Sequence, residues 1–138
     1  MHVRSAILCI DDQEIELSLR KKVLENAGYA VFTAANAAQG LKTFNAHQID
    51  LVITDHFENG PKIGFAAELR KINPRLPIII VSAGNIPRHQ LNPPDYFLHK
   101  LEGPTKMIAT VQSAIRRMRT KLTRFSPPVS SSAKKRLI

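Results

Sequence analysis

The sequence has few of the features that mark secreted or membrane proteins. Its 138 residues contain a single cysteine, Cys9, so no disulfide can form within the chain. Cys9 lies inside a short apolar run, and we expect a small core residue rather than a reactive thiol. No apolar run approaches the roughly 20 residues that span a membrane, and the first residues, MHVRS, lack the layout of a signal peptide. We therefore expect a cytoplasmic protein that does not insert into membranes.

Negative charge is missing from the C-terminal part of the chain. Residues 116–138 contain eight Lys or Arg residues and no Asp or Glu, whereas all 11 acidic residues come earlier. From Phe125 onward the sequence is rich in Pro and Ser and then basic, a composition typical of disordered extensions. We predict one folded domain over residues 1–122 and a basic, disordered tail over 123–138. The tail would attract polyanions, but it contains no recognition helix, so we do not expect sequence-specific DNA binding.

Apolar segments of strand length alternate with helical patterns along the domain. The predicted strands are residues 6–10, 30–34, 51–54, 77–82 and 95–99, and the predicted helices are residues 14–27, 37–46, 65–72 and a last one from Pro104. Asn36 is suited to cap the second helix, and Gly28 closes the first. Strands written as continuous apolar runs between helices indicate a doubly wound α/β fold. Its parallel sheet would have five strands and be covered on both faces.

Helical periodicity predicts which side chains face the core. The expected inward-facing residues are Ile15, Leu19, Val23 and Leu24 in the first helix, Ala38, Leu41 and Phe44 in the second, Phe65, Ala66, Leu69 and Ile72 in the third, and Met107, Ile108, Val111, Ile115 and Met118 in the last. Between the fourth and fifth strands, Pro87, Pro93 and Pro94 lack backbone N–H donors. We therefore predict a shortened or irregular fourth helix at that place.

Polar side chains follow four of the five predicted strands. Asp11 and Asp12 come after the first strand, Asp55 after the third, Ser82 at the end of the fourth and Lys100 after the fifth. Because right-handed crossovers bring the carboxyl ends of parallel strands to one edge, these side chains should meet there. Three neighbouring carboxylates repel one another, and their oxygens suit Mg²⁺. Taken singly, each residue also has an ordinary interpretation, as a helix cap for Asp11 or Asp12, a turn residue for Asp55 and a surface lysine for Lys100.

Together these motifs resemble the receiver domain of two-component response regulators. The segments that carry the resemblance are AILCIDDQEIELSLRKKVLENAGYAV, DLVITD, PIIIVSAG and DYFLHK, within residues 5–118. Pro104 and Met107 follow Lys100 at the spacing at which the family begins its last helix. The resemblance implies a CheY-like (flavodoxin-like) fold. It also implies a bacterial, stand-alone response regulator that is a phosphoprotein of a phosphorelay rather than an enzyme.

The resemblance further implies a phosphoacceptor and a metal site. Asp55 would accept the phosphoryl group from a histidine kinase or a histidine phosphotransfer protein. Asp11, Asp12, Asp55 and the backbone carbonyl of Phe57 would hold Mg²⁺. The downstream effector protein is not identified by the resemblance.

Two further roles are implied for residues near the fourth and fifth strands. Lys100 and the Ser82 hydroxyl would contact the phosphoryl oxygens. Ser82 and Phe97 match the positions that rearrange on phosphorylation in this family. Tyr96, beside Phe97, is a second candidate for the ring that moves.

The chain also departs from the family pattern. Leu101 stands where the family usually has proline, and the segment between Ser82 and Lys100 is shorter than usual. These departures keep open a second function, a receiver-fold scaffold (a pseudo-receiver) that binds partners without phosphorylation. A third, an enzyme or nucleotide-binding protein on the same fold, would need a phosphate-binding glycine loop after the first strand. The segment CIDDQE has no glycine there.

Overall fold

Five parallel strands form a single sheet in the order β2-β1-β3-β4-β5. The computed structural model describes residues 4–55, 63–84 and 95–125. The strands are β1 (Ala6–Ile10), β2 (Ala30–Ala34), β3 (Leu51–Asp55), β4 (Ile78–Ser82) and β5 (Asp95–His99). This confirms the predicted five-stranded parallel α/β fold, with small differences at the ends of β3 and β4.

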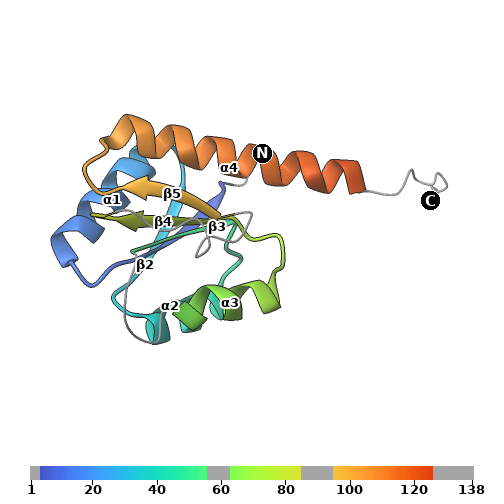
Figure 1. Ribbon diagram of the computed structural model, residues 1–138, viewed down its shortest axis with the longest axis horizontal. Helices are drawn as coiled ribbons and strands as arrows, with labels where there is room; N and C mark the ends of the chain where they lie inside the picture. Colours follow the sequence, from blue (N-terminus) through green and yellow to red (C-terminus); the bar gives the residue numbers. More distant parts are fainter. Residues whose placement is uncertain (1–3, 56–62, 85–94, 126–138) are drawn as a thin grey trace.

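Helices cover both faces of the sheet, as Figure 1 shows. They are α1 (Glu14–Asn26), α2 (Ala37–Ala46), α3 (Ile63–Ile72) and α4 (Pro104–Phe125). α1 and α4 lie on one face, and α2 and α3 lie on the other. The expected short helix between β4 and β5 lies outside the described residues. α4 continues past residue 122 to Phe125, and the rest of the predicted tail is also outside the described part of the chain.

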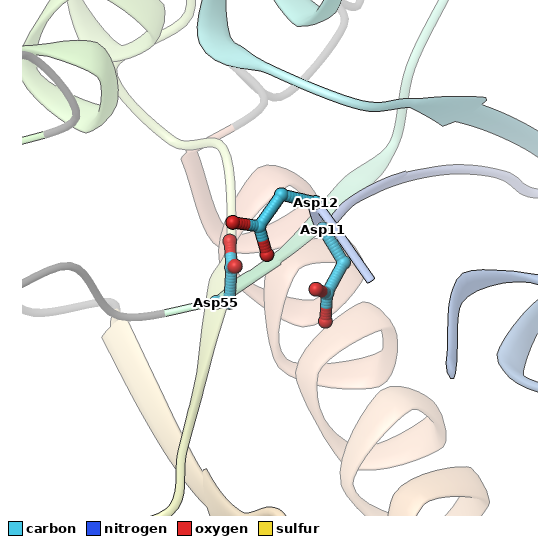
Figure 2. A group of neighbouring side chains, drawn as sticks. All are labelled: Asp11, Asp12 and Asp55. Atoms are coloured by element: carbon cyan, nitrogen blue, oxygen red, sulfur yellow. The ribbon is translucent and has the colours of Figure 1, made fainter. Parts of the chain in front are cut away.

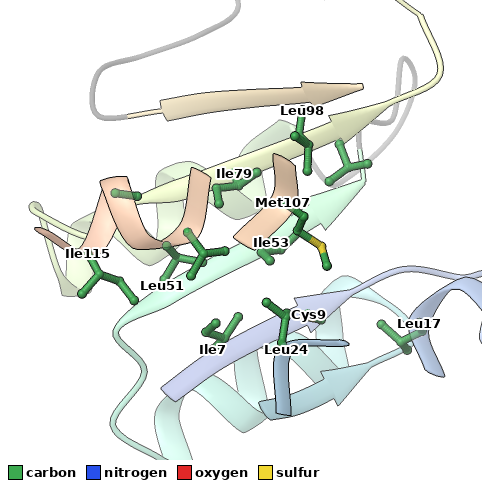
Figure 3. Close-up of a cluster of buried hydrophobic side chains, with 13 residues drawn as sticks. Ile7, Cys9, Leu17, Leu24, Leu51, Ile53, Ile79, Leu98, Met107 and Ile115 are labelled. Carbon is green, nitrogen blue, oxygen red and sulfur yellow. The ribbon is translucent and has the colours of Figure 1, made fainter. Parts of the chain in front are cut away.

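Alternate residues of each strand pack into two separate apolar layers. Under α1 and α4 the layer includes Ile7, Cys9, Ile53, Ile79 and Leu98 from the strands and Leu24, Met107, Val111 and Ile115 from the helices (Figure 3). Under α2 and α3 it includes Leu8, Ile10, Val52, Ile78, Phe44 and Leu69. Each fully buried Leu or Ile stabilises the fold by roughly 1.5–3 kcal/mol. Two buried apolar layers therefore stabilise the sheet that carries the residues at its edge.

Local signals in the sequence set two helix ends. The Asn36 side chain accepts a hydrogen bond from the Gln39 N–H at 2.9 Å, which confirms the predicted cap of α2. Gly28 follows α1 with a φ of 101°, a conformation that glycine adopts without strain. Within the described ranges, no helix has the length and apolar content needed to cross a membrane.

The predicted core face of α1 is wrong at two positions. Ile15 is 77% exposed and Leu19 is 60% exposed, whereas Leu17 and Leu24 are buried. Apolar residues occur on more than one side of this helix, so their spacing does not decide which side packs inward. The side of α1 that packs against the sheet also carries Arg20, whose side chain is only 9% exposed.

Two smaller corrections concern the other face of the sheet. Ala38 is exposed, because α2 packs inward through Ala37, Gly40 and Phe44. Gly40 lies so close to the Ile10 side chain that a Cβ added there would come within 2.8 Å of Ile10 Cδ1. Ile72, the last residue of α3, is 55% exposed rather than part of the core.

Candidate metal and phosphoryl site

Three carboxylates meet at the carboxyl edge of the sheet. Asp11 and Asp12 directly follow β1, and Asp55 is the last residue of the neighbouring strand β3. One oxygen from each carboxylate lies within 4.8 Å of the other two. In Figure 2 the carboxylates of Asp12 and Asp55 point toward each other, and that of Asp11 lies to one side. The predicted convergence of these three residues is therefore confirmed.

The surroundings of the three carboxylates suit a divalent cation. Asp11 is fully buried and Asp55 is 6% exposed, whereas Asp12 is exposed to solvent. Buried negative charges this close destabilise one another unless a cation compensates them. The set supplies hard oxygen ligands and leaves one side open to water, which matches the preference of Mg²⁺. The backbone carbonyl of Phe57, the other expected ligand, lies outside the described residues.

Both oxygens of Asp11 have partners in the protein. Oδ1 accepts a hydrogen bond from the Gln13 N–H at 2.9 Å, and Oδ2 is 3.4 Å from Nη1 of Arg20. Gln13 is the N-cap of α1, and its own side chain makes no capping bond. Asp11 therefore helps to begin α1, as its ordinary interpretation suggested, and also faces the other two carboxylates.

Lys100 and Ser82 lie at adjacent strand ends. The Lys100 backbone N–H donates to the Ser82 carbonyl at 2.8 Å, which joins the ends of β4 and β5. Nζ of Lys100 is 3.3 Å from Oε2 of Glu16 on α1, and the lysine side chain is 25% exposed. The hydroxyl of Ser82, itself half-buried, accepts from the Gly84 N–H at 3.1 Å. Lys100 is thus held at this edge by an ion pair rather than being fully solvated.

The two aromatic residues of β5 have different surroundings. Tyr96 packs against the apolar layer under α4, and the guanidinium of Arg117 lies 6.0 Å from the centre of its ring. Phe97 is half-buried and pairs in register with Ile80. Because neighbouring side chains of a strand point to opposite faces, Phe97 lies on the face away from α4. Its role as a switch residue stays a prediction.

The turn after Lys100 is closed without the proline that is usual in the resembling family. The Leu101 N–H donates to Nδ1 of His99 at 3.1 Å, and the Leu101 side chain is 88% exposed. Glu102 closes the other side, because its carboxylate accepts from the His99 N–H at 3.0 Å and its own N–H donates to the His99 carbonyl at 3.0 Å. The side chains of His99 and Glu102 therefore fix this turn.

Arg20 and Glu16 are residues of the site that sequence reasoning missed. Each lies on α1 and pairs with a predicted site residue, Arg20 with Asp11 and Glu16 with Lys100. Residues four apart in a helix lie on the same face, one turn from each other. The spacing of Glu16 and Arg20 could have indicated that both face the site. Charged residues in an amphipathic helix usually face solvent, however, so the spacing alone did not identify them.

Comparisons with known proteins agree on one family. The model of the response regulator receiver domain matches residues 7–92. That match ends before Lys100, so the assignment of Lys100 rests on the fold and on its position after β5. The transcriptional regulatory protein GlrR of Escherichia coli is 36% identical over 88 residues, which cover 62% of this chain and 20% of GlrR. The probable transcriptional regulator ycf27 of Cyanidium caldarium is 32% identical over 129 residues, covering 88% of this chain and 50% of ycf27.

Solved structures show the same architecture. A response regulator receiver protein from Sinorhizobium medicae superposes with a TM-score of 0.75 at 26% identity, covering 83% of this chain and 97% of that one. A response regulator receiver domain protein from Clostridium thermocellum gives a TM-score of 0.72 at 29% identity, covering 84% and 98%. These chains match nearly over their full length, whereas this chain spans half or less of the two curated relatives.

Proposed function

The chain belongs to the receiver-domain family of response regulators, and we propose that it is a phosphoacceptor that works through Asp55. The observation that carries the proposal is the meeting of Asp55 with Asp11 and Asp12 at the end of a central strand. The donor of the phosphoryl group would be a phosphohistidine on a histidine kinase or a phosphotransfer protein. We propose the bacterial cytoplasm as the location of this reaction.

The proposed reaction is a transfer of one phosphoryl group. An oxygen of Asp55 attacks the phosphorus, the phosphorus–nitrogen bond of the phosphohistidine breaks, and the imidazole nitrogen keeps the electron pair. The transition state is loose and spreads negative charge over three phosphoryl oxygens. The site therefore has to position the reacting groups and neutralise this charge, and it does not need to activate the nucleophile. When bound, Mg²⁺ would supply most of the positive charge that these oxygens need.

The other residues of the site orient the reacting groups. Asp11 and Asp12 would hold the metal beside Asp55, and the Ser82 hydroxyl would donate to a phosphoryl oxygen. Lys100 would leave its ion pair with Glu16 and contact another phosphoryl oxygen, because the phosphoryl group carries more negative charge than one carboxylate. Because the Glu16 side chain is 42% exposed, this exchange costs little.

A second candidate function is a scaffold that signals without phosphorylation. It is favoured by the ion pairs that Asp11 and Lys100 already make with Arg20 and Glu16. Such pairing would hold the site closed to a metal and a phosphoryl group. The expectation that the receiver acts without an attached effector domain stays a prediction.

Binding of Mg²⁺ and beryllofluoride, a mimic of the phosphoryl group, separates the two functions. A phosphoacceptor binds the two ligands cooperatively, since each supplies charge that the other requires. Calorimetric titration of Mg²⁺ with and without the mimic measures this coupling. We expect Asp55→Asn to abolish binding of the mimic. Asp50→Asn, the same change just before the start of β3, should retain the coupling. Unchanged affinities in Asp55→Asn would show that the site assignment is wrong.

A further inference from the structure

Arg20 is a charged residue in a position that helices usually give to an apolar one. It lies between Leu17 and Leu24 on the packed side of α1, and its side chain is 9% exposed. Burying a guanidinium is costly unless it is paired. Its partner is Oδ2 of the fully buried Asp11, at 3.4 Å. The pair therefore joins α1 to the acidic site.

The position of Arg20 places a fixed positive charge at the edge of the carboxylate cluster. The cluster of Asp11, Asp12 and Asp55 would otherwise carry three negative charges within 4.8 Å. Arg20 offsets one of them in the folded chain itself. A divalent cation that approaches the cluster meets this charge, and the repulsion is poorly screened because the guanidinium is buried.

We propose that Arg20 is a positioning residue that holds Asp11 in place and lowers the affinity of the acidic site for Mg²⁺. The inference rests on the proposed function, because it concerns the metal site of the phosphoacceptor. The internal cation stabilises Asp11 before metal arrives, and Mg²⁺ has to bind beside it. Arg20 thus sets the metal concentration at which the site becomes loaded and competent for phosphoryl transfer.

The test compares charge removal at two positions of the same helix. Arg20→Met removes the buried charge, and Lys22→Met removes an exposed charge from α1 and serves as the matched control. We expect Arg20→Met to bind Mg²⁺ about tenfold more tightly than the natural protein, and Lys22→Met to change the affinity by less than about twofold. Calorimetric titration with Mg²⁺ alone gives both values.

Thermal unfolding with and without Mg²⁺ distinguishes the proposed role of Arg20 from a merely structural one. Without metal, Arg20→Met should unfold at a lower temperature than the natural protein, because the buried Asp11 loses its counter-charge. Mg²⁺ should then raise the unfolding temperature of Arg20→Met more than that of the natural protein. Arg20→Gln, which keeps a polar donor but no charge, should also bind Mg²⁺ more tightly and covers the case in which Arg20→Met does not fold. Arg20→Lys should bind close to the natural protein.

The outcomes separate this inference from the proposed function. If the charge-removing variants at Arg20 bind Mg²⁺ no more tightly than Lys22→Met, the role of Arg20 is refuted while the metal site stands. If neither the natural protein nor any variant binds Mg²⁺, the proposed function fails and this inference fails with it.

Discussion

The two ends of β3 carry the same kind of residue in opposite circumstances. Asp50 directly precedes the strand, and its carboxylate accepts a hydrogen bond of 2.7 Å from the Ala6 N–H. Asp55 ends the strand beside two further carboxylates. The Asp50 carboxylate accepts a hydrogen bond from the backbone at the start of β1, so its charge stabilises the fold. Asp55 adds charge where charge is already concentrated, which a fold alone does not require. The neighbours of an aspartate, rather than the residue itself, indicate whether it is structural or functional.

The amino edge of the sheet shows this contrast more widely. Arg119 donates to the Ser5 hydroxyl at 2.9 Å, and Arg117 lies over the Tyr96 ring. These two basic residues contact a hydroxyl and an aromatic ring close to the strands. At the carboxyl edge, three carboxylates lie within 4.8 Å of one another, Asp11 pairs with Arg20 of α1, and Lys100 pairs with Glu16 of α1. The same sheet thus has a structural edge and an edge prepared for a ligand.

The largest effect that we expect is the stabilisation of the carboxyl edge by Mg²⁺. At a concentration about 100 times its dissociation constant, a ligand that binds only the folded state raises the free energy of unfolding by about 2.7 kcal/mol. Urea unfolding of the natural protein and of Asp50→Asn should both show this gain. Asp12→Asn, which removes one of the three carboxylates, should lose most of it. An equal gain in Asp12→Asn would place the cation elsewhere.

At the amino edge, removal of the carboxylate should weaken the fold itself. Asp50→Ala leaves the Ala6 N–H without its charged acceptor, so we expect the free energy of unfolding to fall by roughly 1.5–3 kcal/mol. The loss should be the same with and without Mg²⁺, because Asp50 is remote from the metal site. Urea denaturation with and without Mg²⁺ measures this loss of free energy. A loss that depends on Mg²⁺ would contradict the assignment of a purely structural role to Asp50.

A smaller effect is expected from the pair that holds Lys100. Glu16→Gln removes its counter-charge, and the lysine no longer has to exchange an ion pair when a phosphoryl group binds. Because the pair is partly exposed, we expect beryllofluoride affinity in saturating Mg²⁺ to rise only about two- to threefold. Glu14→Gln, on the exposed first residue of α1, is the control. A weaker affinity in Glu16→Gln would mean that Glu16 positions Lys100 for phosphoryl contact.

The smallest effect concerns Cys9, in the middle of β1. Burial raises the pKa of its thiol from 9.0 to about 12. The thiol should therefore not react with an alkylating reagent at pH 8 in the folded protein, and it should react at once in urea. A raised pKa in the folded state favours folding below pH 9. This contribution is lost progressively as the pH rises from 9 toward 12, because the unfolded thiol ionises first. Rapid alkylation of the folded protein would contradict the assigned burial.

The sequence allowed the sheet and its acidic edge to be predicted for a definite physical reason. Buried parallel strands are continuous apolar runs, so their ends are visible where a polar residue interrupts the run, as at Asp11 and Asp55. The rotation of α1 was not predictable in the same way. Ile15 and Leu19 are as apolar as Leu17 and Leu24, and periodicity alone does not rank the two faces. The side that packs inward also carries Arg20, and its ion pair with Asp11 depends on the three-dimensional path of the chain.

The turn after β5 illustrates the same limit. The replacement of the usual proline by Leu101 was visible, but the bonds that close the turn were not. His99 and Glu102 fix it through backbone and side-chain hydrogen bonds that depend on the local path of the chain. Residue identity predicted where the site lies, and the contacts that hold its parts in place required the structure.

The most direct test of the central claim is the identification of the residue that carries a phosphoryl group. The natural protein, Asp55→Asn and Asp50→Asn are incubated with Mg²⁺ and a small phosphodonor such as acetyl phosphate, and intact masses are measured. We predict one added phosphoryl group on the natural protein and on Asp50→Asn, and none on Asp55→Asn or on the natural protein when Mg²⁺ is chelated. The same added mass on Asp55→Asn, or none on the natural protein in conditions where Mg²⁺ binds, would contradict this prediction.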